Sequence, residues 1–78
     1  MVTRQVYSTG KDKSTWDGGY TYAVARIERD NLGAEAVTNW WVETLETPKS
    51  ERSNFWFGMN RALVETMGRM ALEMEAAA

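Results

Sequence analysis

The last third of the chain carries the strongest constraint on the fold, an apolar pattern with the period of an α-helix. Large apolar side chains recur there at steps of three and four residues, at Phe55, Met59, Leu63, Met67, Met70 and Met74. This spacing places them on one face of a helix. Thr47 and Pro48 are a typical helix start, and Ser53 or Asn54 offers a second start if the first turn is irregular. We predict a helix over about residues 48–76.

Two glycines and three aromatic residues complicate this helix. Gly58 and Gly68 each cost a helix about 1 kcal/mol relative to alanine, and we expect close approach to a sheet to offset that cost. The consecutive aromatic residues 55–57 span about 200° of a helix, so one of them should be partly exposed. The methionine stripe would suit an adaptable groove, but methionines at helical spacing are more often core, and we assign them to the core.

The rest of the chain is typical of β-structure. "VTRQVYS" alternates loosely before Gly10, while "YTYAVARIERD" and "AEAVTNWWVETLET" are dense in aromatic and β-branched residues. We predict strands over about residues 2–8, 20–30 and 34–46. Between the last two, "DNLG" provides Gly33 for the left-handed position of a hairpin loop. The prediction is a single α+β domain over residues 1–78, a three-stranded antiparallel sheet in βββα order with one long C-terminal helix packed on one face.

A sheet covered by one helix leaves its other face open, and the tryptophan pair bears on that face. Successive strand residues point to opposite faces, so Trp40 and Trp41 cannot both lie beneath the helix. A three-residue hairpin loop avoids like charges directly opposite one another, and it places Trp40 under the helix and Trp41 on the open face with Ile27 and Val37. The other register exchanges the two tryptophans. In both registers a tryptophan remains on the open face.

Trp16 lies in the loop-like stretch "TGKDKSTWDGG". The spacing of its oxygen-bearing residues does not fit a calcium loop, and no glycine-lysine-serine or glycine-lysine-threonine run marks a phosphate loop. We interpret the stretch as a connection between strands. Trp16 either folds back over the sheet edge or stands exposed as a contact residue.

Composition excludes most chemistry. The 78 residues include no histidine and no cysteine, which removes the usual zinc sites, disulfides and thiolate nucleophiles. Carboxylates could act as acid and base only in a pocket that separates their pKa values, and a small sheet with one helix offers no obvious cleft. We therefore predict a non-enzyme with no catalytic residue, no cofactor and no metal.

Apolar runs in the chain are short. They are too short for a membrane span, and the N-terminus lacks the apolar core of a signal peptide. Without cysteine, nothing points to an oxidising compartment either. We predict a cytoplasmic protein without membrane contact.

The net charge of −2 is unevenly distributed, because residues 27–47 carry five acidic side chains and one basic side chain. This excess argues against direct nucleic-acid binding, which needs clustered lysine and arginine. It suits a basic protein partner, such as a nucleic-acid-binding complex, contacted through Glu35 and Glu43. A merely solvated acidic surface fits the same pattern.

These observations favour a small acidic binding protein that blocks a macromolecular partner. Aromatic side chains give much contact area for little lost rotamer freedom. The predicted partner-binding residues are Trp41, Trp16, Ile27, Val37, Glu35 and Glu43. The same face could instead be a homodimer interface.

In size, negative charge, lack of catalytic residues and expected layout of a small sheet with a long helix, the chain resembles phage-encoded anti-CRISPR inhibitors. The resemblance covers the whole chain and rests on layout, with no motif shared within "WDGGYTYAVARIERDNLGAEAVTNWW", so it carries over no site residues. It implies blocking of a CRISPR effector complex in the host cytoplasm, often through basic surfaces that hold nucleic acid. The alternatives are a homodimeric structural or assembly protein and an antitoxin-like regulator.

Overall fold

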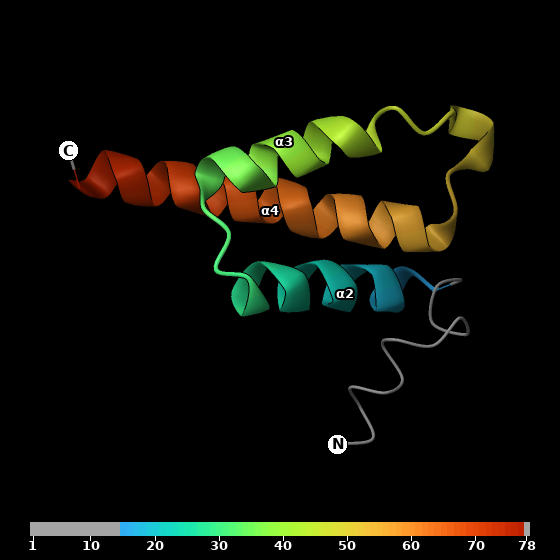
Figure 1. Ribbon diagram of the computed structural model, residues 1–78, viewed down its shortest axis with the longest axis horizontal. Helices are drawn as coiled ribbons and strands as arrows, with labels where there is room; N and C mark the ends of the chain where they lie inside the picture. Colours follow the sequence, from blue (N-terminus) through green and yellow to red (C-terminus); the bar gives the residue numbers. More distant parts are fainter. Residues whose placement is uncertain (1–14, 78) are drawn as a thin grey trace, which may run out of the picture.

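The computed structural model describes residues 15–77, and these residues form α-helices joined by short connections (Figure 1). The elements are α2 (Trp16–Arg29), α3 (Ala34–Thr44), the 3₁₀ helix η2 (Lys49–Glu51) and α4 (Asn54–Ala77). No strand occurs within residues 15–77. The described part of the chain is therefore an all-helical domain.

The predicted three-stranded sheet, and with it the α+β class, is wrong. Residues 20–30 and 34–46, predicted as strands, lie mainly in α2 and α3. The strand predicted over residues 2–8 falls outside the described residues. A long helix does follow residue 48, but it begins at Asn54, after η2.

Local capping explains why α2 is a helix despite its strand-like composition. Thr15 accepts a hydrogen bond from the backbone N–H of Gly18 at 2.9 Å, as an N-cap residue does. Asp17 lies in the first turn and Arg26 and Arg29 in the last, where each charge opposes the helix dipole. The preference of β-branched and aromatic residues for strands is weak enough for such capping and for packing to override it.

The turn after α2 is a helix end and not a hairpin loop. Asn31 has the positive φ of 52°, whereas Gly33 has φ −89° and ψ −176° and is the N-cap of α3. The N–H of Leu32 donates to the carbonyl of Ile27 at 3.0 Å, and the N–H of Asn31 donates to Glu28 at 3.3 Å. This is the Schellman pattern, in which a left-handed residue, often Asn or Gly, ends a helix. Leu32 also packs against the core cluster that contains Ile27, consistent with the apolar contact which that motif favours.

α4 is the longest helix, and α2 and α3 lie on either side of it (Figure 1). Each helix contributes to the core, whose buried apolar residues are Ala23, Ile27, Val37, Trp56, Ala62 and Leu63. Around the cluster of Ile27, Val37 and Leu63 pack half-buried apolar side chains, including the methionines at positions 59, 67 and 70. The inner part of the methionine stripe thus faces the core, whereas Met74 is exposed.

Where α2 meets α4, backbone lies directly against backbone. A Cβ added at Gly19 would overlap the carbonyl of Phe55 and come within 2.9 Å of the nitrogen of Met59. A Cβ added at Gly58 would likewise overlap the carbonyl of Trp16. Both glycines are buried. We call this contact the glycine seam. It corrects the expectation that Gly58 approaches a sheet.

Gly68, the other glycine of α4, makes no such contact. It is exposed, and a Cβ added there would meet no atom within 4 Å. The expectation of a close approach at Gly68 is therefore not met by the described part of the chain.

Where α3 meets α4, polar side chains make the connection. The indole N–H of Trp56 donates to the carbonyl of Thr44 at 2.8 Å, and Asn60 donates to the hydroxyl of Thr44 at 3.2 Å. That hydroxyl in turn donates to the carbonyl of Trp41 at 2.6 Å. The guanidinium of Arg52 lies 4.4 Å from the Trp56 ring centroid and donates to two backbone carbonyls of the segment that joins the helices. We call this arrangement the Thr44 network.

Candidate protein-binding surface

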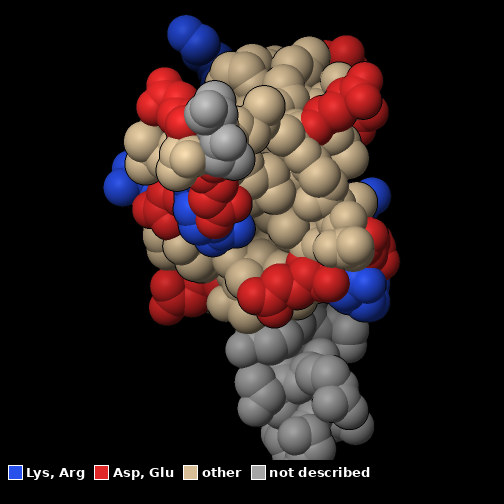
Figure 2. Space-filling model, turned by 90° about the vertical axis from the view of Figure 1, so that its left-hand side faces the viewer, with Lys and Arg blue, Asp and Glu red and all other residues tan. Residues whose placement is uncertain are grey.

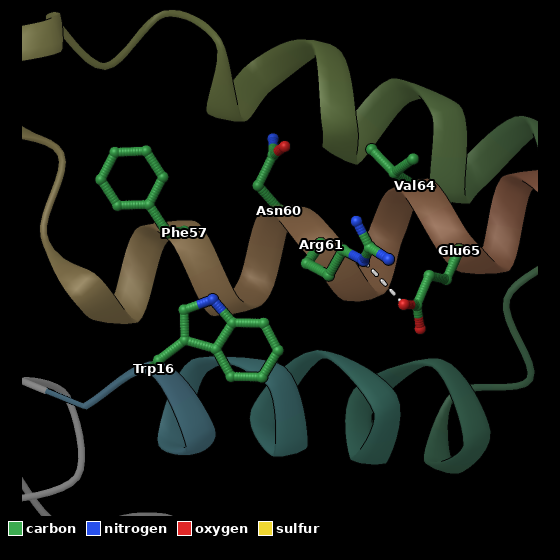
Figure 3. Close-up of a pocket in the computed structure, with 6 residues that line it drawn as sticks. All are labelled: Trp16, Phe57, Asn60, Arg61, Val64 and Glu65. Carbon is green, nitrogen blue, oxygen red and sulfur yellow. Dashed lines mark hydrogen bonds and ion pairs between the residues drawn. The ribbon is translucent and has the colours of Figure 1, made fainter.

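A shallow, open hollow of about 540 Å³ lies over α4 where α2 begins (Figure 3). Its lining residues are Trp16, Phe57, Asn60, Arg61, Val64 and Glu65. Three of them are large apolar residues with much exposed surface: Trp16 at 43%, Phe57 at 49% and Val64 at 43%. Isolated exposed apolar residues are common, but a group of them marks a candidate interaction surface.

Helix geometry and the glycine seam together bring these side chains to one place. Phe57, Arg61 and Val64 follow one another along α4 at steps of four and three residues, so they share one helix face. Trp16 comes from the first turn of α2. Its carbonyl rests against Gly58, and Figure 3 shows its indole on the α2 side of α4 and the Phe57 ring on the α3 side.

Polar contacts orient one side of the hollow. The Tyr20 ring stacks on Trp16 with 5.3 Å between centroids, and the Tyr20 hydroxyl donates to Glu65 Oε1 at 2.5 Å. Arg61 Nε donates to the other carboxylate oxygen, Glu65 Oε2, at 2.7 Å (Figure 3). Glu65 therefore links α2 to α4 and holds both Tyr20 and Arg61.

The pKa values of this group shift as the contacts require. The hydrogen bond to Glu65 raises the pKa of Tyr20, because the carboxylate holds the phenolic proton. The hydrogen bond from Tyr20, followed by that from Arg61, lowers the pKa of Glu65. Glu65 is thus a charged hydrogen-bond acceptor at neutral pH, whose two oxygens already have donors.

Two of the predicted partner-binding residues lie in the core. Ile27 is 7% exposed and Val37 is fully buried, and both pack against Leu63 of α4. The open sheet face on which they were placed does not exist, because the sides of α2 and α3 that carry them cover α4.

The tryptophan pair also departs from the expected division between two faces. Trp40 and Trp41 are both half-buried against the core cluster, since neighbouring helix residues are about 100° apart and not on opposite sides. Trp40 meets Tyr22 edge-on, with 6.1 Å between centroids, and Arg26 lies 4.4 Å from its ring centroid. The indole nitrogen of Trp41 is buried and has no hydrogen-bond partner among residues 15–77.

The other predicted residues are exposed, but they do not form one group. Trp16 lines the hollow. Glu35 lies in the first turn of α3, and Glu43 lies near its end, two turns away along the helix.

Sequence reasoning did not select five residues of the hollow: Phe57, Asn60, Arg61, Val64 and Glu65. The aromatic run at residues 55–57 did imply one exposed ring, and Phe57 is the exposed one. Val64 lies outside the apolar stripe of α4, which is a usable signal for an apolar residue that faces away from the core. The sequence contains no signal for the hydrogen bond between Tyr20 and Glu65, because this contact depends on how α2 and α4 pack.

The hollow provides contact surface and little chemistry. Within residues 15–77, no group of three or more His, Cys, Asp or Glu side chains could hold a metal ion. No helix in that range is both long and apolar enough to cross a membrane. With Glu65 held by two donors, the lining offers aromatic rings, one aliphatic side chain, the amide of Asn60 and an ion pair.

Comparisons of the chain with models of protein families, with curated proteins and with solved structures found no match. The layout behind the resemblance to anti-CRISPR inhibitors included a sheet, and residues 15–77 contain no strand. Nothing in these comparisons or in residues 15–77 supports an inhibitory or anti-CRISPR role.

Proposed function

We propose that this chain is a non-enzymatic protein-binding domain. Its binding face consists of Trp16, Phe57, Arg61, Val64 and Glu65. The observation that carries the proposal is the clustering of two exposed aromatic rings and an exposed valine around one hollow. We propose further that it acts in the cytoplasm, since a chain without cysteine draws no benefit from an oxidising compartment.

The composition of the binding face suits protein recognition. Tryptophan, other aromatic residues and arginine are enriched where interfaces bind most strongly. Stacking on Tyr20 restricts the Trp16 ring before any partner arrives. A side chain that is already ordered loses less entropy on binding, so this stacking supports a role for Trp16 as an anchor.

Charge adds a property of the partner. The chain has a net charge of −2, and Glu35 and Glu43 on α3 are exposed. A partner with a basic surface would therefore be attracted at long range. Replacing both glutamates by lysine should slow association and flatten its dependence on salt, measured by stopped-flow or surface-immobilised binding. Equal association rates at low and high salt would contradict the proposed long-range attraction between the acidic chain and a basic partner.

The test is capture from cell lysate with the intact chain and a surface variant. We expect the double variant Phe57→Asp, Val64→Asp to lose the captured protein, because two charges would be placed in the centre of the interface. The matched control is Val42→Asp, which adds a charge at a side chain that is 48% exposed and does not line the hollow. Thermal melting checks that both variants remain folded.

Association with a second copy counts as binding in this test, so the mass of each protein in solution is measured as well. A chain that forms no complex with itself or with any other protein overturns the proposed function. Complexes that survive the double variant as well as the control would overturn the assignment of the binding face.

A further inference from the structure

The apolar surface of the binding face continues along α4 toward its C-terminal end. Val64, Gly68 and Leu72 follow at steps of four residues, and all are exposed, Leu72 at 67%. Ala71 is exposed beside them. Figure 1 shows that the C-terminal turns of α4 extend past the ends of α2 and α3. We call Val64, Gly68, Ala71 and Leu72 the outer stripe.

We infer that the outer stripe binds a second copy of this chain, with the two α4 helices antiparallel and crossing at Gly68. The inference rests on the proposed function, because it names a second copy as one partner of that same surface, in addition to the basic partner that the charge of the chain favours. Most small homodimers have two-fold symmetry, in which one patch serves both copies. Under that symmetry, a residue that lies a given number of positions before Gly68 in one copy faces the residue that lies the same number after Gly68 in the other copy.

The outer stripe is self-complementary in this arrangement. Val64 lies four residues before Gly68 and Leu72 lies four residues after it. Val64 of each copy therefore faces Leu72 of the other. Two such pairs flank the crossing point and cover four exposed aliphatic side chains. Burying that apolar area drives association.

Gly68 suits the crossing point, because a residue without a Cβ lets two helix backbones approach closely. In the helix interior it costs about 1 kcal/mol relative to alanine. Within residues 15–77, a Cβ added there would meet no other atom within 4 Å beyond the adjoining backbone of α4, so no packing contact among these residues offsets that cost. The same helix already uses Gly58 for a close helix contact, at the glycine seam. A second helix over Gly68 would repeat that arrangement between copies.

Charge fixes the direction of the pairing. Arg61 and Glu75 lie seven residues before and after Gly68, and both are exposed. Antiparallel helices bring Arg61 of each copy toward Glu75 of the other, whereas parallel helices would bring like charges together. Arg61 uses Nε on Glu65, and a guanidinium has further N–H donors for a second carboxylate. Figure 2 views the molecule from the end where α4 terminates, and it shows charged side chains around uncharged surface.

The same geometry joins the outer stripe to the hollow. Glu75 of the second copy comes beside Arg61, which lines the hollow with Phe57 and Trp16. The dimer therefore covers part of the binding face as well as the stripe. A stable interface buries about 1,200 Å² or more in total, and one helix pair with part of the hollow lies at the low end of that range. We expect a reversible dimer that forms at micromolar concentration.

The experiment measures mass against concentration by sedimentation equilibrium for the intact chain and its variants. We expect the wild type to change from one copy to two as concentration rises. Gly68→Glu should remain a single copy, because it places two like charges and two bulky side chains at the symmetry axis. Gly68→Ala is the matched variant that adds only a methyl group, and it should weaken the dimer less. Its thermal melt should also show a fold at least as stable as the wild type.

A charge exchange tests the antiparallel direction. Arg61→Glu alone and Glu75→Arg alone should each weaken the dimer about tenfold, since every substitution acts twice in a symmetric pair. The double variant Arg61→Glu, Glu75→Arg restores opposite charges across the interface and should recover most of the wild-type association. Failure of the double variant to recover it overturns the antiparallel pairing.

The outcomes separate this inference from the proposed function. A wild type that stays a single copy at every concentration, while the lysate experiment captures a partner that depends on Phe57, overturns the second copy and leaves the binding domain. A dimer unaffected by Gly68→Glu places the contact elsewhere and overturns the outer stripe. A single copy with no captured partner overturns both.

Discussion

The two helices that flank α4 are attached to it in different ways. Beyond the apolar core that all three helices share, α2 meets α4 through bare backbone at Gly19 and Gly58, whereas α3 meets it through the hydrogen bonds of the Thr44 network. The glycine seam depends on the absence of atoms, so it should be sensitive to the size of any added group. The Thr44 network depends on donors and acceptors meeting, so it should be sensitive to the loss of one partner.

The largest expected effect comes from filling the glycine seam. Gly58→Ala should lower the free energy of unfolding by about 3 kcal/mol or more, because the new methyl group would overlap backbone and not a side chain that can move. Gly68→Ala is the matched control in the same helix and should raise it by up to about 1 kcal/mol. Urea unfolding of the three proteins measures both, at a concentration where the wild type is a single copy. Equal effects of the two substitutions would mean that α2 and α4 are not in backbone contact.

A smaller effect is expected from removing one donor of the Thr44 network. Trp56→Phe deletes the indole N–H that donates to Thr44, and it leaves a buried carbonyl without that donor. Trp41→Phe removes the same atoms from a tryptophan whose indole nitrogen has no hydrogen-bond partner in the described part of the chain. We therefore expect Trp56→Phe to cost about 1 kcal/mol or more beyond Trp41→Phe. Thermal and urea unfolding would show the reverse order, or no difference, if the network contributed nothing.

The smallest effect concerns Tyr20 and Glu65, which add a polar link across the glycine-seam side of α4. The usual pKa of Glu65 is 4.5 and is lowered in the fold, so its contribution to stability is present above 4.5 and is lost as pH falls through the lowered value. The usual pKa of Tyr20 is 10.0 and is raised, so its contribution is present below 10.0 and is lost as pH rises through the raised value.

Tyr20→Phe should therefore be slightly less stable than the wild type between pH 4.5 and pH 10.0, where both contributions are present. The two proteins should become equally stable below the lowered pKa of Glu65 and above the raised pKa of Tyr20. Both side chains are solvent-exposed at this contact, which keeps the difference small. Urea unfolding near neutral pH, well below pH 4.5 and well above pH 10 measures the profile. A constant difference at every pH would mean that the substitution acts through packing of the ring and not through the hydrogen bond.

The sequence predicted one of the three long elements correctly and misassigned two. Six apolar residues at helical spacing identified α4, because a strand cannot place such a set on one face. In α2, the buried pair of Ala23 and Ile27 also has helical spacing, but aromatic and β-branched neighbours suggested a strand. Packing against α4 outweighed that preference, and packing partners cannot be seen in a single segment.

The "DNLG" turn shows why the topology was misread. A left-handed residue followed by an apolar one fits a hairpin loop and a helix end equally well. Here Asn31 takes the positive φ and the N–H of Leu32 donates to the carbonyl of Ile27, which ends α2. The sequence-based expectation assigned the left-handed conformation to Gly33, and for that reason it predicted a hairpin loop where α2 ends.

The candidate surface was predictable only in part. Trp16 was proposed as a contact residue, and the aromatic run at 55–57 implied one exposed ring. Which side of α4 remains open depends on where α2 and α3 attach, and that is set by the glycine seam and the Thr44 network. Arg61, Val64 and Glu65 could not be selected without it.

The different surroundings of the tryptophans also give the protein two optical reporters. Trp40, Trp41 and Trp56 pack in or against the core, and Trp16 stands half in water at the edge of the hollow. Loss of the fold would move the indole emission of the first three to longer wavelength. Docking of a partner on Trp16 would move its emission to shorter wavelength. A single fluorescence spectrum therefore distinguishes unfolding from binding by the direction of its shift.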